Sequence, residues 1–179
     1  MFAKVENNQV VAANSSKDFF KGSTGIYEVI YNTTNLKDTE FYYNGAETFT
    51  FANDQVTASY APATAKALND VNAVDQNGQP VLDQDGKQLV NKGLKSNHIA
   101  RIKSQAASLL QSTDWYIIRN AESGAAIPAN ISTYRAAVRT KSNDMEVLIN
   151  AVSSVEQLAD LYKYDKDTKT RPLGDFPRL

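Results

Sequence analysis

The chain has 179 residues, with 19 Lys and Arg against 20 Asp and Glu, which gives a formal net charge of -1. This balance argues against a nucleic-acid partner, because domains that neutralise a phosphate backbone carry a clear basic excess. Cysteine is absent, which excludes disulfide frameworks, thiolate metal sites and cysteine nucleophiles, and no apolar run is long enough to predict a transmembrane helix or a membrane partner.

Residues 1–60 are typical of a small, antiparallel, β-rich docking domain in an α+β protein. Two short β-type runs flank Asn7 and Asn8, a pair that tolerates the positive φ of a tight hairpin turn. The run 25–31 is rich in β-branched and aromatic residues and predicts a further strand.

The strongest hairpin signal lies in the run 41–51, where Asn44 and Gly45 are flanked by aromatic residues. Phe49 and Phe51 alternate with threonines, so we expect their rings to share one face of a strand. A sheet this small needs a cover for that face, either a helix of this chain or a neighbouring subunit.

Residues 61–93 predict a polar arm or linker. Two similar acidic turns, 75–82 and 83–90, form an imperfect repeat of eight residues. Asp83 and Asp85 resemble the start of a calcium-binding loop, but Lys92 lies where that loop should be closing on its last ligands. We therefore favour successive β-turns or a small hairpin, with no metal.

Residues 94–165 predict a helical hairpin domain, and 166–179 an extended tail. Two long helices, 96–111 and 128–152, should pack antiparallel, with Ser96 or Asn97 capping the first. A short helical segment between them is expected to open at Thr113 and Asp114 and to end at Gly124, and Ser154 and Gln157 form a capping box for a last helix. The predicted core stripes consist of Ile99, Ile102, Ala106, Leu109 and Leu110 on the first helix, and Ile131, Tyr134, Val138, Met145, Leu148, Ile149 and Val152 on the second.

No pattern of catalytic residues stands out. His98 is the single histidine, so a His-based triad with a second histidine and a two-histidine metal site are excluded, and we expect His98 to be exposed or half-buried. The glycines are scattered and form no phosphate-binding loop. We therefore expect a protein that is not an enzyme and has no cofactor.

Trp115, the only tryptophan, invites two interpretations. It could anchor a partner, since Trp and Tyr dominate interface hot spots, or it could close the end of the helical hairpin from inside. We favour the second, which leaves Tyr116 and Tyr134 as the better exposed candidates. Nearby basic residues are interleaved with acidic ones and predict a solvated face of mixed charge; they are Arg119, Arg135, Arg139 and Lys141.

The helical region also resembles a known group of proteins. A Leu-rich helix leads into Thr113-Asp114-Trp115, and a second helix begins at Ile127-Pro128 and carries Tyr134-Arg135-Ala136-Ala137-Val138-Arg139. These motifs resemble the C-terminal helical region of small tail-associated and tail-fibre-assembly-like proteins of tailed bacteriophages. The opening residues 2–11 also resemble the start of virion proteins from large marine phages that infect photosynthetic bacteria.

The resemblance implies a virion structural protein of the tail, baseplate or fibre, which is made in the host cytoplasm, contacts other virion proteins and is oligomeric in the particle. The alternative that it implies is a tail-fibre assembly chaperone that does not remain in the particle. It carries no catalytic residues to transfer. The residues that we expect to make contacts with other chains are aromatic: Tyr27, Tyr43, Phe49, Phe51, Tyr116 and Tyr134.

Overall fold

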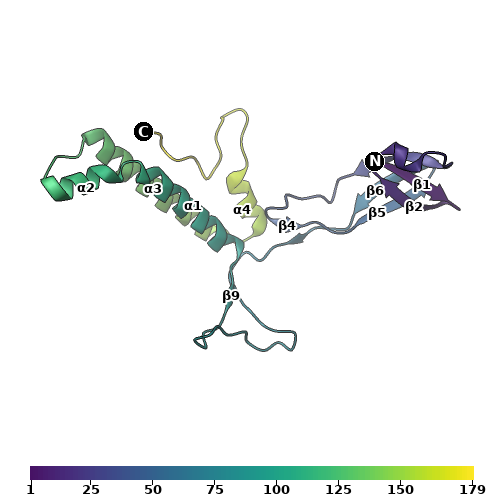
Figure 1. Ribbon diagram of the computed structural model, residues 1–179, viewed down its shortest axis with the longest axis horizontal. Coiled ribbons are helices and arrows are strands. Elements are labelled where there is room, and N and C mark those ends of the chain that lie inside the picture. The colour runs from purple at the N-terminus through teal and green to yellow at the C-terminus, as the bar shows by residue number, and fades with distance from the viewer. The chain divides into compact units, whose positions relative to one another are not determined.

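The computed structural model describes residues 1–179 and shows an α+β protein. Its chain divides into two compact units, Met1–Lys66 and Ala67–Leu179, the first built from strands and the second mainly from helices (Figure 1). No helix combines the length and the apolar character needed to cross a membrane.

The first unit contains a five-stranded sheet in the order β2-β1-β3-β6-β5. The edge strands β2 and β5 contact each other, so the sheet is curled. Pairing is antiparallel, as predicted, except between β3 and β6, which run parallel. The strands are β1 (Phe2–Glu6), β2 (Gln9–Asn14), β3 (Ile26–Asn32), β5 (Glu47–Ala52) and β6 (Gln55–Tyr60).

The two tight hairpins of this sheet turn on polar pairs with positive φ. Asn7 and Asn8 have φ values of 52° and 61°, which confirms the first predicted hairpin. The second turn lies at Asn53 and Asp54, with the same φ values, and joins β5 to β6. Short polar side chains adopt this left-handed region more readily than other non-glycine residues, which favours the turn.

The predicted hairpin at Asn44-Gly45 is wrong. β4 (Tyr42–Tyr43) pairs with β7 (Thr64–Ala65), not with the strand that follows it. A Cβ at Gly45 would overlap the carbonyl of Ala61, so the glycine permits a close approach of two backbone segments. The side chain of Asn44 meanwhile hydrogen-bonds the backbone N–H and C=O of Lys37.

The core of the first unit consists of small and aromatic side chains. Phe49 and Phe51 do share a face, as expected, and pack half-buried on this core. The ring of Tyr27 lies 4.8 Å from that of Phe51, centroid to centroid. The buried members of the core are Ala3, Val29, Val56 and Ala58.

The second unit begins with a branched segment, 71–91, that we call the cloverleaf segment. Its base is the pairing of β8 (Val71–Asn72) with β9 (Val90–Asn91). Between these two strands the chain forms two loops, which lie at the far end of the segment (Figure 1). The loops are the two predicted turns: Asp75 Oδ1 accepts from the N–H groups of Asn77 and Gln79, and Asp83 Oδ1 accepts from those of Asp85 and Lys87. Successive turns are therefore confirmed.

A closed ring of three backbone hydrogen bonds joins these loops. Ala73 donates to Leu89, Leu89 to Val81, and Val81 to Ala73, over 2.8, 2.8 and 3.0 Å. The three residues are spaced by the eight-residue repeat. The side-chain amide of Gln88 donates to all three carbonyls, at 2.7 Å from that of Ala73, 3.2 Å from that of Val81 and 3.1 Å from that of Leu89. Side chains around this ring remain exposed: Val71, Val74, Leu82, Leu89 and Val90.

Asp70 fixes the base of the cloverleaf segment to the first helix, α1 (Leu94–Gln111). Its carboxylate accepts from the N–H of Gly93, at 2.9 Å, and pairs with the Lys92 ammonium, at 2.8 Å. Gly93 occupies the N-cap position and has no side chain that could cap the helix. The carboxylate of Asp70, which lies outside the helix, therefore accepts a backbone N–H at the electropositive start of α1. The predicted cap at Ser96 or Asn97 is wrong.

α1 packs antiparallel against α3 (Ala129–Ala151), as predicted, with Pro128 at the start of α3. Lys95, in the first turn of α1, donates to the carbonyl of Asn150 near the end of α3. The predicted stripes are largely buried, except that Leu148 is exposed. Arg135, which lies outside the predicted stripe near the other end of α3, is buried.

The last helix, α4 (Val155–Tyr162), buries Leu158 and begins at the predicted cap. The Ser154 hydroxyl accepts from the N–H of Gln157, and the Gln157 side chain accepts in return from the N–H of Ser153, one residue before the position that a capping box predicts. Beyond α4 the chain turns back, because Asp165 pairs with Thr170, and Leu173 is buried.

Candidate protein-binding surface

The helix α2 (Asp114–Ser123), between the two long helices, has no buried residue. Trp115, Ile117 and Ile118 are 49, 39 and 56% exposed. Of these, Trp115 and Ile118 are three residues apart and lie on one face of the helix, whereas Ile117 lies on the other side. Neighbouring exposed apolar side chains mark contact sites. We call Trp115 and Ile118 the α2 surface.

Trp115 is therefore not the internal plug that we expected. Its ring stacks on that of Tyr116, with 3.9 Å between centroids and a tilt of 32°. The guanidinium of Arg119, one turn later, lies 4.8 Å from the Trp115 ring and 5.5 Å from the Tyr116 ring. A cation held over aromatic faces restricts all three side chains. The stack thus favours one position of the Trp115 ring.

Arg135 of α3 holds the corner from which α2 departs. Its guanidinium donates to the carbonyl of Leu110 at 2.9 Å and to the hydroxyl of Thr113 at 2.6 Å, and it forms an ion pair with Asp114 at 2.8 Å. The Thr113 hydroxyl donates in turn to the carbonyl of Leu110, so this carbonyl in the last turn of α1 has partners beyond the helix.

This arrangement corrects two expectations. Arg135 is 6% exposed and does not belong to a solvated basic face; its guanidinium pairs with the carboxylate of Asp114, whose side chain is half exposed. Thr113 precedes α2 as expected, but its hydroxyl caps α1 and not α2. The electropositive start of α2 is met by Asp114 in its first turn.

The other candidate residues are placed as follows. Tyr134 is buried in the helical core, so the expectation that it is exposed is wrong, and Tyr116 is half-buried. Tyr27, Phe49 and Phe51 are half-buried in the core of the first unit. Tyr43 is exposed, with the ammonium of Lys66 5.2 Å from its ring centroid. Only Tyr116 and Tyr134 lie in the same unit as the α2 surface; the other rings belong to the first unit.

His98 is 1% exposed, which corrects the expectation of an exposed or half-buried side chain. Its Nδ1 lies 2.7 Å from the hydroxyl of Tyr162, so it joins α1 to α4. Its neighbours include no group of three or more His, Asp or Glu residues suited to hold a metal ion. His98 is thus part of the buried contact between α1 and α4.

Ile117 and Ile118 were missed from the sequence because neither falls on a long periodic stripe. The signal was nevertheless present: Trp115 to Ile118 is a run of four large apolar residues, which a ten-residue helix cannot bury on one face.

Comparison of the chain with known protein families, with characterised proteins and with solved structures gives no match.

Proposed function

We propose that this protein is a non-enzymatic structural protein of a tailed-bacteriophage virion, an adaptor associated with the tail, baseplate or fibre, and that the α2 surface contacts another virion protein. One observation carries the contact: no residue of α2 is buried, although the helix contains Trp115, Ile117 and Ile118. Trp, together with Arg and Tyr, is enriched among residues that dominate binding energies.

The resemblance to phage tail proteins supplies the kind of particle. Its motif residues are separated in sequence, yet Arg135 binds both Thr113 and Asp114 in space. Arg135 thereby joins the two parts of the motif at the corner from which α2 departs, which supports a role of the motif in presenting α2.

The first test is mass spectrometry of purified particles of the phage that encodes the chain. A virion adaptor should be present in a fixed ratio to known tail proteins. Its absence from particles that otherwise assemble normally contradicts the proposal and favours the tail-fibre assembly chaperone.

The second test addresses the surface. The double variant Trp115→Ser/Ile118→Ser should fold normally, because both side chains are about half exposed, and should fail to join particles. Val147→Ser is the matched control, since Val147 is an exposed aliphatic residue on α3 outside the α2 surface. Normal incorporation of the double variant rules out α2 as the contact.

A further inference from the structure

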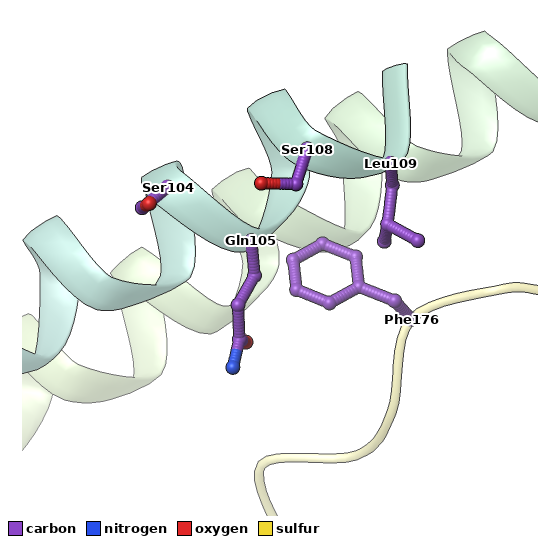
Figure 2. A pocket seen from close by; sticks show the side chains of 5 residues that line it. All are labelled: Ser104, Gln105, Ser108, Leu109 and Phe176. Atoms are coloured by element: carbon purple, nitrogen blue, oxygen red, sulfur yellow. The ribbon is translucent and has the colours of Figure 1, made fainter. Parts of the chain in front are cut away.

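The second unit holds its non-helical segments in two different ways. The segment that follows α4 packs on the helices: Leu173 is 2% exposed, and Figure 2 shows the ring of Phe176 beside Leu109 of α1. The loops of the cloverleaf segment, 74–80 and 82–87, are exposed instead, and their hydrogen bonds are made within the segment. Chemistry that needs water and a backbone that can open is therefore favoured in these loops.

The sequence contains two Asn-Gly steps, Asn44-Gly45 and Asn77-Gly78. At such a step the amide nitrogen of the glycine can attack the side-chain carboxamide of the asparagine, because glycine has no Cβ that hinders the approach. The reaction requires a carboxamide that is free to turn toward the main chain and a backbone that can move. The two steps differ in both respects.

The step at Asn77 meets both requirements. Asn77 is exposed, and its hydrogen bond to Asp75 Oδ1 uses the backbone N–H, which leaves the carboxamide free. Gly78 has a φ of 77°, and nothing lies within 4 Å of the place where a Cβ would stand. The N–H of Gly78 donates to the carbonyl of Asp75 at 3.0 Å across this exposed turn, so opening of the turn releases it.

The step at Asn44 meets neither requirement. Its Oδ1 accepts from the N–H of Lys37 at 2.9 Å, and its Nδ2 donates to the carbonyl of Lys37 at 3.0 Å. Asn44 and Gly45 are half-buried, and the backbone of Gly45 lies against that of Ala61. The carboxamide cannot turn toward the main chain without breaking both bonds to Lys37.

We propose that Asn77 is a site of spontaneous deamidation, whereas Asn44 is protected, and that the loop accommodates only one of the two products. The Gly78 nitrogen bonds to Cγ of Asn77, the Cγ–Nδ2 bond breaks, and ammonia leaves with the proton of the Gly78 N–H. Water then opens the five-membered imide. It gives aspartate when the bond from Cγ to nitrogen breaks, and isoaspartate when the main-chain bond breaks. No atom is oxidised or reduced, and water is the only co-reactant.

The second loop indicates which product fits. Asp85-Gly86 holds the place there that Asn77-Gly78 holds in the first loop, with glycine φ values of 78° and 77°. Asp83 Oδ1 accepts from the N–H of Asp85 just as Asp75 Oδ1 accepts from that of Asn77. Aspartate at position 77 should therefore leave the first loop intact. Isoaspartate adds one carbon to the main chain, so Asp75 Oδ1 cannot keep both of its N–H donors in place.

The test incubates the full-length chain in mildly alkaline buffer, native and in urea, and follows both steps by mass spectrometry of proteolytic peptides. In the native chain Asn77 should convert at least about tenfold faster than Asn44, which must first break two hydrogen bonds. In urea the two rates should be comparable. Equal rates in the native chain, or an Asn77 that stays intact there while both steps convert in urea, overturn the proposal. In the matched control Asn77→Gln the reaction at this position should be lost, because glutamine would have to close a larger ring.

Hydrogen exchange compares the two products. Asn77→Asp represents the aspartate product and should keep the protection of the ring amides of Ala73, Val81 and Leu89. The isoaspartate form, separated chromatographically from an incubated sample, should exchange these amides roughly tenfold faster. Equal protection in both forms overturns the proposal that the loop accommodates only one product. Neither measurement depends on the proposed function.

Discussion

The guanidinium of Arg135 donates a 2.6 Å hydrogen bond to the hydroxyl of Thr113, and both side chains are buried. The same guanidinium pairs with Asp114, which opens α2. One buried cation thus joins the end of α1, the start of α2 and the middle of α3. The direction in which α2 leaves the hairpin depends on this contact.

Replacing Arg135 should therefore cost more than replacing any exposed arginine. We expect Arg135→Met to destabilise the chain by about 3 kcal/mol, because Thr113 and Leu110 lose a buried donor and Asp114 loses its partner. Urea denaturation measures this. Arg139→Met, one turn further along α3 at an exposed position, should change stability by less than about 0.5 kcal/mol.

The same variant should disturb α2 in particular. Trp115 is the only tryptophan, so its fluorescence reports on α2 alone. We expect a shift of the emission maximum in Arg135→Met under conditions where the helices of the hairpin remain intact by circular dichroism. An unchanged emission spectrum would show that the stack of Trp115, Tyr116 and Arg119 sets the position of α2 without Arg135.

Gln88 should be needed as an amide in the cloverleaf segment. In Gln88→Glu a carboxylate would face three carbonyl oxygens to which the amide now donates. We expect the amide protons of Ala73, Val81 and Leu89 to exchange at least about tenfold faster, which corresponds to about 1.4 kcal/mol of local opening. Hydrogen exchange measured by NMR resolves the three sites.

Gln84→Glu introduces the same charge change at an exposed position of the second loop. Its effect on exchange at the ring should be negligible. Equal acceleration in both variants would mean that net charge, and not the position of the Gln88 amide, determines the stability of the segment.

Phe51 should act as a core residue of the first unit. We expect Phe51→Ser to destabilise that unit by about 2 kcal/mol, less than the loss for a fully buried phenylalanine, because the ring is half-buried and packs on Tyr27. Thermal unfolding followed by NMR signals of the strands measures it. Thr50→Ser, at the exposed neighbouring position, should have little effect. A Phe51→Ser variant as stable as the wild type would mean that Phe51 is not needed in the core and is available to contact another chain.

Asp70 should make the junction of the cloverleaf segment and α1 sensitive to acid. Its hydrogen bonds with Lys92, Ser96 and the Gly93 N–H lower its pKa from 3.8 to about 2. A carboxyl group with a lowered pKa in the folded state stabilises that state fully above its unfolded value, and the stabilisation is lost as the pH falls from about 4 to about 2. Asp70→Asn should remove this pH dependence of the melting temperature, which a pH titration of both proteins measures.

Local signals predicted several turns and helix ends that local interactions determine. The turn at Asn7-Asn8, the end of α2 at Gly124 and the start of α3 at Pro128 depend on backbone preferences of the residues themselves, and all three were found. The hairpin at Asn44-Gly45 failed because a tertiary contact uses both residues: Gly45 meets Ala61, and Asn44 binds Lys37. The correct turn, at Asn53-Asp54, was visible as a polar pair between alternating apolar residues.

Predicting the candidate surface requires knowing which side chains are buried. The sequence predicts burial poorly for long or charged side chains. Arg135 stands next to the core stripe of α3, and only the position of the α1 end decides that it turns inward. Trp115 follows a helix end in sequence and was expected to close the end of the helical hairpin from inside. Its exposure follows from the corner that Arg135 forms with Thr113 and Asp114. The periodic pattern of apolar residues in the sequence does not reveal this contact.

The closed ring in the cloverleaf segment has a consequence for the survival of the chain. Exposed loop tips are preferred sites of proteolytic cleavage, and this segment consists largely of exposed loops. It also carries five exposed aliphatic side chains. Cleavage requires several residues to detach together as an extended strand, and here each loop spans only eight residues between ring positions whose amides are bonded to one another. Short loops of this kind close in well under a microsecond. The segment should therefore reclose faster than a protease can bind it. Its aliphatic side chains can then stay exposed to solvent without making the segment an easy site of cleavage.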